Sequence, residues 1–194
     1  DRYLDNVTSS FTVSTCFSQC TTDGTCAAIS GCTDPSAINH FDAATEDDGS
    51  CVYMNESTLP LVQITTDTPI LDDPRIVANM KVTNLPGGLN NLADEPNEYN
   101  GQITIEIRGS SSQFFPKQSY ALETQDSTGA NNNVPLMGMP AENDWILHGP
   151  YSDKSLMRNA VIYEMGTAIG QYTTRRRYCE LYINGDYRGV YMFM

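Results

Sequence analysis

The sequence predicts an α+β fold, in which a mainly antiparallel sheet with one principal helix follows a small module held by disulfides. Short segments of alternating apolar and polar residues recur through the second part of the chain, and one long segment has helical periodicity. Five of the six cysteines fall within the first 51 residues. Sequential strands with a single helix favour an antiparallel sheet over a parallel, doubly wound one.

Composition and charge limit the class of protein. A chain of 194 residues can bury the core of one domain and still carry a small appendage. Its 11 Lys and Arg residues against 24 Asp and Glu residues give a net charge of -13. Nucleic acid and anionic membranes need a cationic face, so we expect neither as a partner. No apolar run approaches the roughly 18 to 20 residues that span a bilayer, so we expect no transmembrane segment.

The cysteines divide the chain and indicate its compartment. We expect a disulfide-rich module over residues 1–57 and the main domain over residues 58–194. Small modules of this kind occur in oxidising compartments, so we expect a secreted, extracellular or cell-surface protein. The spacing of the cysteines matches no zinc template. We expect two of the first three cysteines to pair with each other and the third to bond the last one; the four are Cys16, Cys20, Cys26 and Cys179.

The strands of the main domain are predicted by period-two alternation. The clearest case is Ile103, Ile105 and Ile107, which would face the core between polar neighbours. Asn184-Gly185 is a strong signal for a hairpin turn between the last two strands. We expect strands at residues 61–64, 76–83, 103–107, 120–123, 145–147, 179–183 and 187–192.

The segment 142–159 joins a short apolar strand, a Gly149-Pro150 break and the start of the principal helix, with Ser152 as its expected cap. We expect this helix over residues 153–169, with an apolar stripe that packs on the sheet: Met157, Val161, Met165, Ala168 and Ile169. Lys154 and Arg158 would then lie on one face, where two cations repel unless an anion such as a phosphate lies between them. The alternative is a solvated basic turn.

Four segments together resemble the CotH family of spore-coat and secreted protein kinases. They are RGSS at 108–111, FPKQSYAL at 115–122, ENDWILHGPYSDKSLMRN at 142–159 and ELYINGDYRGVY at 180–191. The resemblance implies an atypical, protein-kinase-like N-terminal lobe. It also implies binding of ATP with Mg²⁺ or Mn²⁺ and phosphorylation of protein substrates outside the cytoplasm.

The resemblance also implies a nucleotide site. Arg108 and Lys117 would lie nearest the phosphates, with Lys154 and Arg158 as helpers. Phosphoryl transfer depends on positioning and on stabilisation of charge, so convergent cations suit this role. Two alternatives remain open. Arg108 and Lys117 could instead be charges at the edge of the sheet that pair with Glu106 and Glu123. Alternatively, Glu164 could orient Lys117 as an ion pair does in ordinary kinases.

In the family, a second lobe supplies the acidic residues that hold the metal and activate the acceptor hydroxyl. The sequence holds no acidic pair downstream of its last hairpin, so we expect no catalysis by this chain alone. The first functional hypothesis is therefore the nucleotide-binding lobe of a secreted, CotH-type, kinase-like protein. The second is an extracellular structural or adhesive protein, such as a surface or filament subunit that contacts neighbouring subunits, including copies of itself.

The segment GCTDPSAINHFDAATEDDGSC at 31–51 resembles a short module of secreted and surface proteins of marine and gliding bacteria. That resemblance implies a bridge between Cys32 and Cys51. The loop would gather oxygen ligands of the kind that Ca²⁺ requires, which makes a calcium-stabilised binding module a third hypothesis. The alternative is that these side chains only shape turns. The candidate ligands are Asp34, Asn39, Asp42, Asp47 and Asp48.

Overall fold

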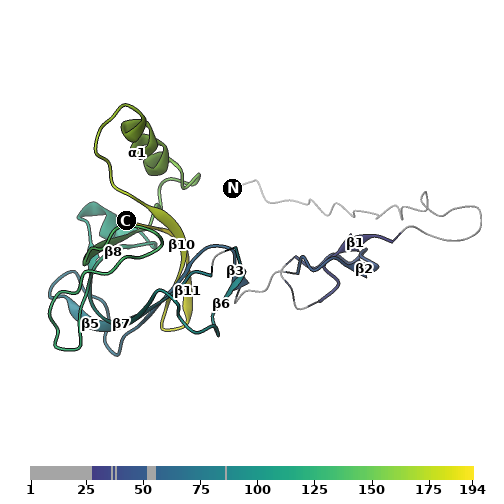
Figure 1. Ribbon diagram of the computed structural model, residues 1–194, viewed down its shortest axis with the longest axis horizontal. Coiled ribbons are helices and arrows are strands. Elements are labelled where there is room, and N and C mark those ends of the chain that lie inside the picture. The colour runs from purple at the N-terminus through teal and green to yellow at the C-terminus, as the bar shows by residue number, and fades with distance from the viewer. Residues whose placement is uncertain (1–27, 36, 38, 52–55, 86) are drawn as a thin grey trace, which may run out of the picture. The chain divides into compact units, whose positions relative to one another are not determined.

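The computed structural model describes residues 28–35, 37, 39–51, 56–85 and 87–194, drawn in colour in Figure 1. The chain divides into two compact units, Asp1–Val52 and Tyr53–Met194. Cys16, Cys20 and Cys26 lie outside the described residues, so their pairing stays a prediction. In the described part of the chain, no helix is long and apolar enough to cross a membrane.

The second unit is a closed β-barrel of seven strands, in the order β10-β11-β9-β8-β7-β5-β4. A short ladder of two further strands, β3 (Glu56–Ser57) and β6 (Asn90–Asn91), lies beside it in the same unit. The barrel strands are β4 (Leu61–Thr65), β5 (Ile76–Thr83), β7 (Tyr99–Arg108), β8 (Ser119–Thr124), β9 (Asp144–His148), β10 (Arg177–Ile183) and β11 (Asp186–Phe193).

The predicted antiparallel sheet of a kinase-like lobe is therefore wrong. Six neighbouring pairs of barrel strands are antiparallel, and β10 pairs with β4 in parallel, with Leu181 opposite Val62. The single parallel pair has a simple cause. Strands that alternate in direction around a closed ring must meet once in the same direction when their number is odd. Instead of an open α+β sheet, the described residues form a mixed barrel with one short α-helix and one 3₁₀ helix, Ser111–Phe114.

The alternation of the strands decides which side chains fill the barrel. Ile103 and Ile105 on β7 are fully buried, as predicted, and Ile107 is partly buried. From β9, Trp145 and Leu147 point inward, and the Trp145 ring packs against that of Phe193 with centroids 5.1 Å apart. Asp144, Ile146 and His148 therefore face the outside of the wall.

The hairpin prediction is confirmed. Asn184 and Gly185 join β10 to β11 with φ angles of 52° and 83°, the left-handed pair that a type I′ turn requires. The Asn184 side chain also binds the backbone of Thr66, since its Oδ1 accepts from the amide at 2.9 Å and its Nδ2 donates to the carbonyl at 3.0 Å. The turn thereby also ties the hairpin to the end of β4.

The helix α1 (Arg158–Ala168) is shorter than predicted and does not pack on the sheet. Figure 1 shows it standing off the barrel, and none of its residues is buried. The stripe expected in the core lies open, with exposed fractions of 46% for Val161, 58% for Met165 and 75% for Ile169. The prediction failed because apolar periodicity indicates an apolar face but not what covers it.

Polar contacts attach α1 to the segment that enters β10. Arg176 donates from Nη2 to the Ala160 carbonyl at 2.7 Å and to Glu164 Oε2 at 2.8 Å. The Tyr178 hydroxyl donates to the Leu156 carbonyl at 2.6 Å. Polar contacts thus join the helix to this segment, while the apolar side chains of Val161, Ile162 and Met165 stay exposed.

The first unit contains the predicted disulfide between Cys32 and Cys51 and a two-strand ladder, β1 (Ser30–Gly31) with β2 (Glu46–Asp47). Cys179 differs from its prediction, because it is a free thiol that is fully buried in the barrel. Burial raises the pKa of the Cys179 thiol above its ordinary range, so the reactive thiolate form is suppressed.

Candidate functional site

A cleft of about 460 Å³ lies on the outer face of the barrel, where four strands end. Arg108 at the end of β7 is paired in register with Ser119 of β8, and His148 of β9 is paired with Met192 of β11. All four side chains line the cleft. The chain from residue 149 to α1 forms the opposite wall, which explains why the outward-facing Met192 is fully buried.

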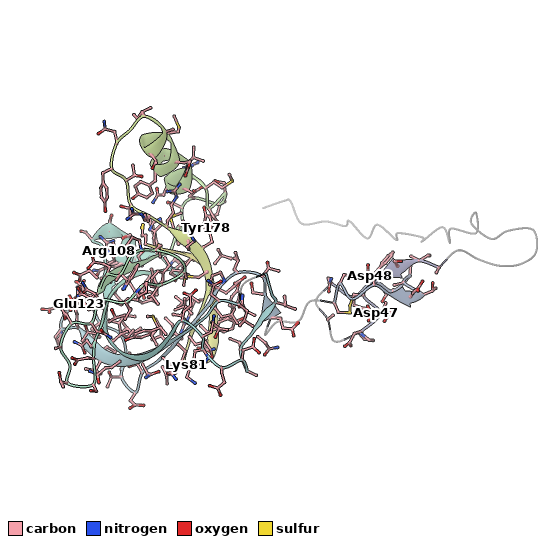
Figure 2. The ribbon with its side chains drawn as sticks, viewed as in Figure 1. Asp47, Asp48, Lys81, Arg108, Glu123 and Tyr178 are labelled. Atoms are coloured by element: carbon pink, nitrogen blue, oxygen red, sulfur yellow. A yellow bond between two sulfur atoms is a disulfide. The ribbon has the colours of Figure 1, made fainter. Side chains whose placement is uncertain are left out.

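Arg108 is a positively charged side chain in the lining of the cleft. The alternation of β7 directs it outward, because Ile103 and Ile105 point into the core. Figure 2 shows Arg108 at the end of the barrel nearest α1. Its guanidinium forms no ion pair or hydrogen bond with a described residue. In a chain with a net charge of -13, an arginine that lines a cleft without a carboxylate partner is suited to an anionic ligand.

Arg158 also lines the cleft, but it is partly neutralised. Its Nε lies 3.6 Å from Asp153 Oδ1, and its side chain is 80% exposed. Asp153 Oδ2 accepts from the Arg158 backbone N–H, the first amide of α1, at 2.8 Å. The expected cap, Ser152, does not lie at the N-cap position of α1, which is Met157. Hydrogen bonds, led by that from Ser155, lower the pKa of the Asp153 carboxyl. The carboxylate therefore stays charged and is committed to the helix start.

Lys117 does not line the cleft. Its ammonium donates to the Val190 carbonyl at 2.7 Å and lies 4.6 Å from the centre of the Tyr191 ring. Burial lowers the pKa of Lys117, and the carboxylate of Glu180 acts against this shift. Lys117 therefore links the start of β8 to the backbone of β11. It does not line the cleft that Arg108 lines.

Lys154 does not line the cleft either. Because α1 begins at Arg158, Lys154 lies in the preceding turn and the two cations do not share a helix face. Its ammonium donates to the Tyr151 carbonyl at 2.8 Å and lies 4.2 Å from the centre of the Tyr151 ring. That ring stacks on Phe115, with centroids 5.1 Å apart and an interplanar angle of 28°. Phe115 and Tyr151 both line the cleft, so this stacked aromatic pair and Arg108 belong to the same cleft.

His148 and Asn159 face each other across the cleft, with His148 Nε2 3.1 Å from Asn159 Nδ2. The amide nitrogen of Asn159 can only donate, so His148 Nε2 accepts and the imidazole is neutral in this arrangement. Burial lowers the pKa of His148, the nearby Arg108 guanidinium lowers it further, and Asp153 acts in the opposite direction. An anion bound near Arg108 would offset that repulsion and favour the imidazolium.

We expect His148 to make the ligand-free protein less stable in mild acid. The unfolded chain binds the His148 proton at about pH 6.5, and the folded chain binds it only at lower pH. The unfolded state thus binds more protons between these values, so the free energy of unfolding falls as the pH falls through that window. Urea unfolding from about pH 7 to about pH 5 should show a weaker pH dependence for His148→Gln than for the native chain. Parallel curves for the two proteins would contradict the assignment.

The structure excludes the two ion-pair alternatives for the predicted cations. Glu106 and Glu123 on neighbouring strands are both paired with Arg75, whose Nε lies 3.1 Å from Glu106 Oε1. Glu164 pairs with Arg176. Neither Arg108 nor Lys117 is therefore held by the carboxylates that the sequence offered as partners.

The candidate calcium ligands shape turns in the first unit. Asp47 Oδ1 accepts from the Gly49 amide at 3.1 Å, Asp48 Oδ1 accepts from the Ser50 amide at 2.9 Å, and Asn39 Nδ2 donates to the Ser50 carbonyl at 2.7 Å. Figure 2 labels Asp47 and Asp48 on this unit. Among the residues that the structure describes, no three acidic, histidine or cysteine side chains converge to hold a metal. Asp34 lies in the same loop, and Asp42 Oδ1 lies 3.1 Å from His40 Nδ1.

Sequence reasoning missed His148, Asn159 and the aromatic pair. His148 could have been found from the alternation of its strand. Trp145 and Leu147 point inward, so the next position must face outward, and it stands directly before the Gly149-Pro150 break. Asn159 gave no such signal, because its position depends on where α1 begins.

Comparison with known proteins bears on this part of the chain. Residues 105–194, which carry Arg108, His148, Arg158 and Asn159, match the family model described as CotH kinase protein. The predicted resemblance is thereby confirmed over this segment. No curated protein matches the chain.

Proposed function

We propose that this chain is the nucleotide-binding part of a CotH-type protein, because residues 105–194 match the family model described as CotH kinase protein. In this proposal the Arg108 cleft holds the phosphates. The observation that carries this proposal is that Arg108 lines a cleft of an acidic chain and forms no ion pair with any residue that the structure describes. Charge-assisted hydrogen bonds from an arginine fork are a strong means of phosphate recognition. Arg158 and His148 lie in the same cleft and can add positive charge as a ligand arrives.

The stacked rings of Phe115 and Tyr151 suit the base of the nucleotide. Both line the cleft, and aromatic faces bind bases by stacking. The cleft volume of about 460 Å³ is within the range of ligand pockets. We therefore assign the base to the aromatic pair and the phosphates to the arginine side.

The described residues fit a nucleotide better than a resident metal. Asp153 is the carboxylate in the cleft wall, and its oxygens are committed to Ser155 and Arg158. A Mg²⁺ or Mn²⁺ ion commonly binds through substrate phosphates and water with few protein ligands, so it would arrive with the nucleotide. No described carboxylate in this cleft is free to activate an acceptor hydroxyl. We therefore propose nucleotide binding, without phosphoryl transfer to a protein substrate, as the activity of this chain by itself.

We expect Arg108→Gln in the full chain to weaken ATP binding by roughly tenfold or more, because charged hydrogen bonds to phosphate are lost. Isothermal titration calorimetry with ATP, with and without Mg²⁺, measures the change. Arg188→Gln is the matched control, since Arg188 is a half-exposed arginine on β11 outside the cleft. It should bind ATP as the native chain does. Equal affinity of the Arg108→Gln and native proteins would remove the basis of the proposal.

We further propose that the protein works outside the cytoplasm, because disulfides such as Cys32–Cys51 form and persist mainly in oxidising compartments. Thiol labelling of protein taken directly from its source tests this. Two protected cysteines at positions 32 and 51 are expected, and free thiols at both would contradict secretion. The bridge lies in the first unit, so this test is independent of the cleft.

One observation favours the second function, an extracellular structural or adhesive subunit. The exposed apolar residues of α1 are the kind of surface that contacts another protein. Such a subunit would self-associate without nucleotide. Light scattering of the purified chain, with and without ATP, distinguishes the two functions: an ATP-independent oligomer together with no ATP binding would favour the structural role.

A further inference from the structure

A groove of about 530 Å³ separates α1 from the segment that enters β10, on a different face of the helix from the cleft. Ala160, Glu164 and Thr167 line it from the helix, at the spacing of one helical face. The run Arg175-Arg176-Arg177 lines it from the other side. We call this the arginine groove. Nothing in the proposed nucleotide site uses it.

The charge of the arginine groove is unusual for this chain. Three consecutive arginines account for a large share of the 11 basic residues, in a chain whose net charge is -13. Arg176 is satisfied by Glu164 and the Ala160 carbonyl. Arg175 is exposed and forms no ion pair or hydrogen bond with a described residue, and Arg177 donates only to the Arg176 carbonyl, at 2.8 Å. Two guanidiniums are therefore available for external carboxylates.

Exposed apolar side chains of α1 lie next to the arginine groove. Val161, Met165 and Ile162 on α1 are exposed to 46%, 58% and 60%. Val161 and Glu164 are three residues apart on the helix, so the apolar stripe borders the groove directly. Tyr172, which lines the groove, is 90% exposed. Cations and apolar groups thus adjoin on one face of α1.

We propose that the arginine groove and the adjoining stripe of α1 bind an acidic, amphipathic segment of a partner protein. Carboxylates of such a segment pair with Arg175 and Arg177, and its apolar side chains cover Val161 and Met165. A nucleic acid offers phosphates but no aliphatic side chains for the stripe, and a small free anion would leave the stripe uncovered. An amphipathic polypeptide is the ligand that satisfies both halves of the surface.

The test uses the full chain and a labelled peptide that is helical, with Glu on one face and Leu on the other, followed by fluorescence anisotropy. Binding is expected, and it should weaken as salt is added, because the contact is partly electrostatic. Two matched peptides, one with Gln for Glu and one with Ser for Leu, should each bind markedly less. No binding of the first peptide, or equal binding of the Gln peptide, would overturn the proposal.

Variants of the protein locate the contact. The double variant Arg175→Gln, Arg177→Gln should bind the peptide roughly tenfold less tightly or weaker, and Val161→Ser with Met165→Ser should also weaken it. Arg188→Gln should bind it as the native chain does. If the double variant fails to fold, Arg175→Gln alone must still weaken binding, since this exposed side chain makes no contact within the described structure. Unchanged binding by that variant refutes the groove as the site.

One further outcome bears on the identity of the occupant. If the native chain forms oligomers that the double variant does not, the occupant is a second copy of this chain and the proposal fails.

ATP affinity separates this inference from the proposed function. The Arg175 and Arg177 substitutions should leave ATP affinity unchanged, whereas Arg108→Gln should leave peptide binding unchanged. A folded double variant that loses both activities would overturn the assignment of a separate surface.

Discussion

Trp145→Ala should lower the free energy of unfolding by about 3–5 kcal/mol, which is a large part of the stability of an ordinary domain. Trp145 is 4% exposed and fills the barrel against Phe193. Its Nε1 also donates to the Glu142 carbonyl at 3.1 Å. The variant would lose buried apolar surface, leave a cavity in the core and free a carbonyl that is partly shielded from water.

Urea unfolding followed by far-UV circular dichroism measures this effect, because Trp145 is the only tryptophan and its fluorescence is lost in the variant. Val161→Ala is the control, since Val161 lies on the exposed stripe of α1 and should change the free energy of unfolding by about 0.5 kcal/mol or less. A similar loss in both variants would mean that α1 is packed in solution and that the barrel interior is not the main core.

Gly149→Ala should destabilise the protein by about 1–3 kcal/mol and also weaken ATP binding. An added Cβ would lie 2.7 Å from the Gln118 carbonyl oxygen, 3.0 Å from a ring carbon of Tyr191 and 3.1 Å from Lys117 Cγ. The first of these atoms belongs to the backbone and cannot move without β8. The Gly149 amide also donates to Ser119 Oγ at 3.0 Å, so the end of β9 would separate from its neighbour beside the cleft.

Gly88→Ala provides the comparison, since its nearest new contact is the Leu85 side chain at 3.3 Å. This variant should be much less affected in urea unfolding and should bind ATP normally, if calorimetry is done well below the melting temperature. If Gly149→Ala lost stability but kept normal ATP affinity, ATP binding would not depend on the side of the cleft formed by the end of β9, at His148 and Gly149.

Local signals predicted the strands well but could not predict how the barrel closes. Alternation located β7, and Asn184-Gly185 located the last hairpin, because both depend on neighbouring residues. The parallel pairing of β4 with β10 joins segments from opposite ends of the second unit. No pattern within either strand indicates that partner, so an open antiparallel sheet was the natural and incorrect expectation.

The candidate site shows the same limit. Arg108 was predicted through the resemblance and does line a cleft, because its strand alternation is regular. Lys117 was misplaced, since its long side chain reaches the Val190 carbonyl on a strand far along the chain. The helix start was predicted several residues too early, since α1 begins at Arg158 and Asp153 lies in the preceding turn, where its carboxylate accepts from the Arg158 amide. Side-chain reach and long-range pairing, which the sequence does not encode locally, account for these errors.

The closure of the barrel between β4 and β10 also bears on how the chain folds. During synthesis, the strands from β4 to β9 emerge well before the hairpin that seals the gap, and until then both edges of the growing sheet can pair with other chains. Contacts between segments so distant in sequence form slowly. The half-made barrel is therefore the stage at which this chain is most exposed to aggregation.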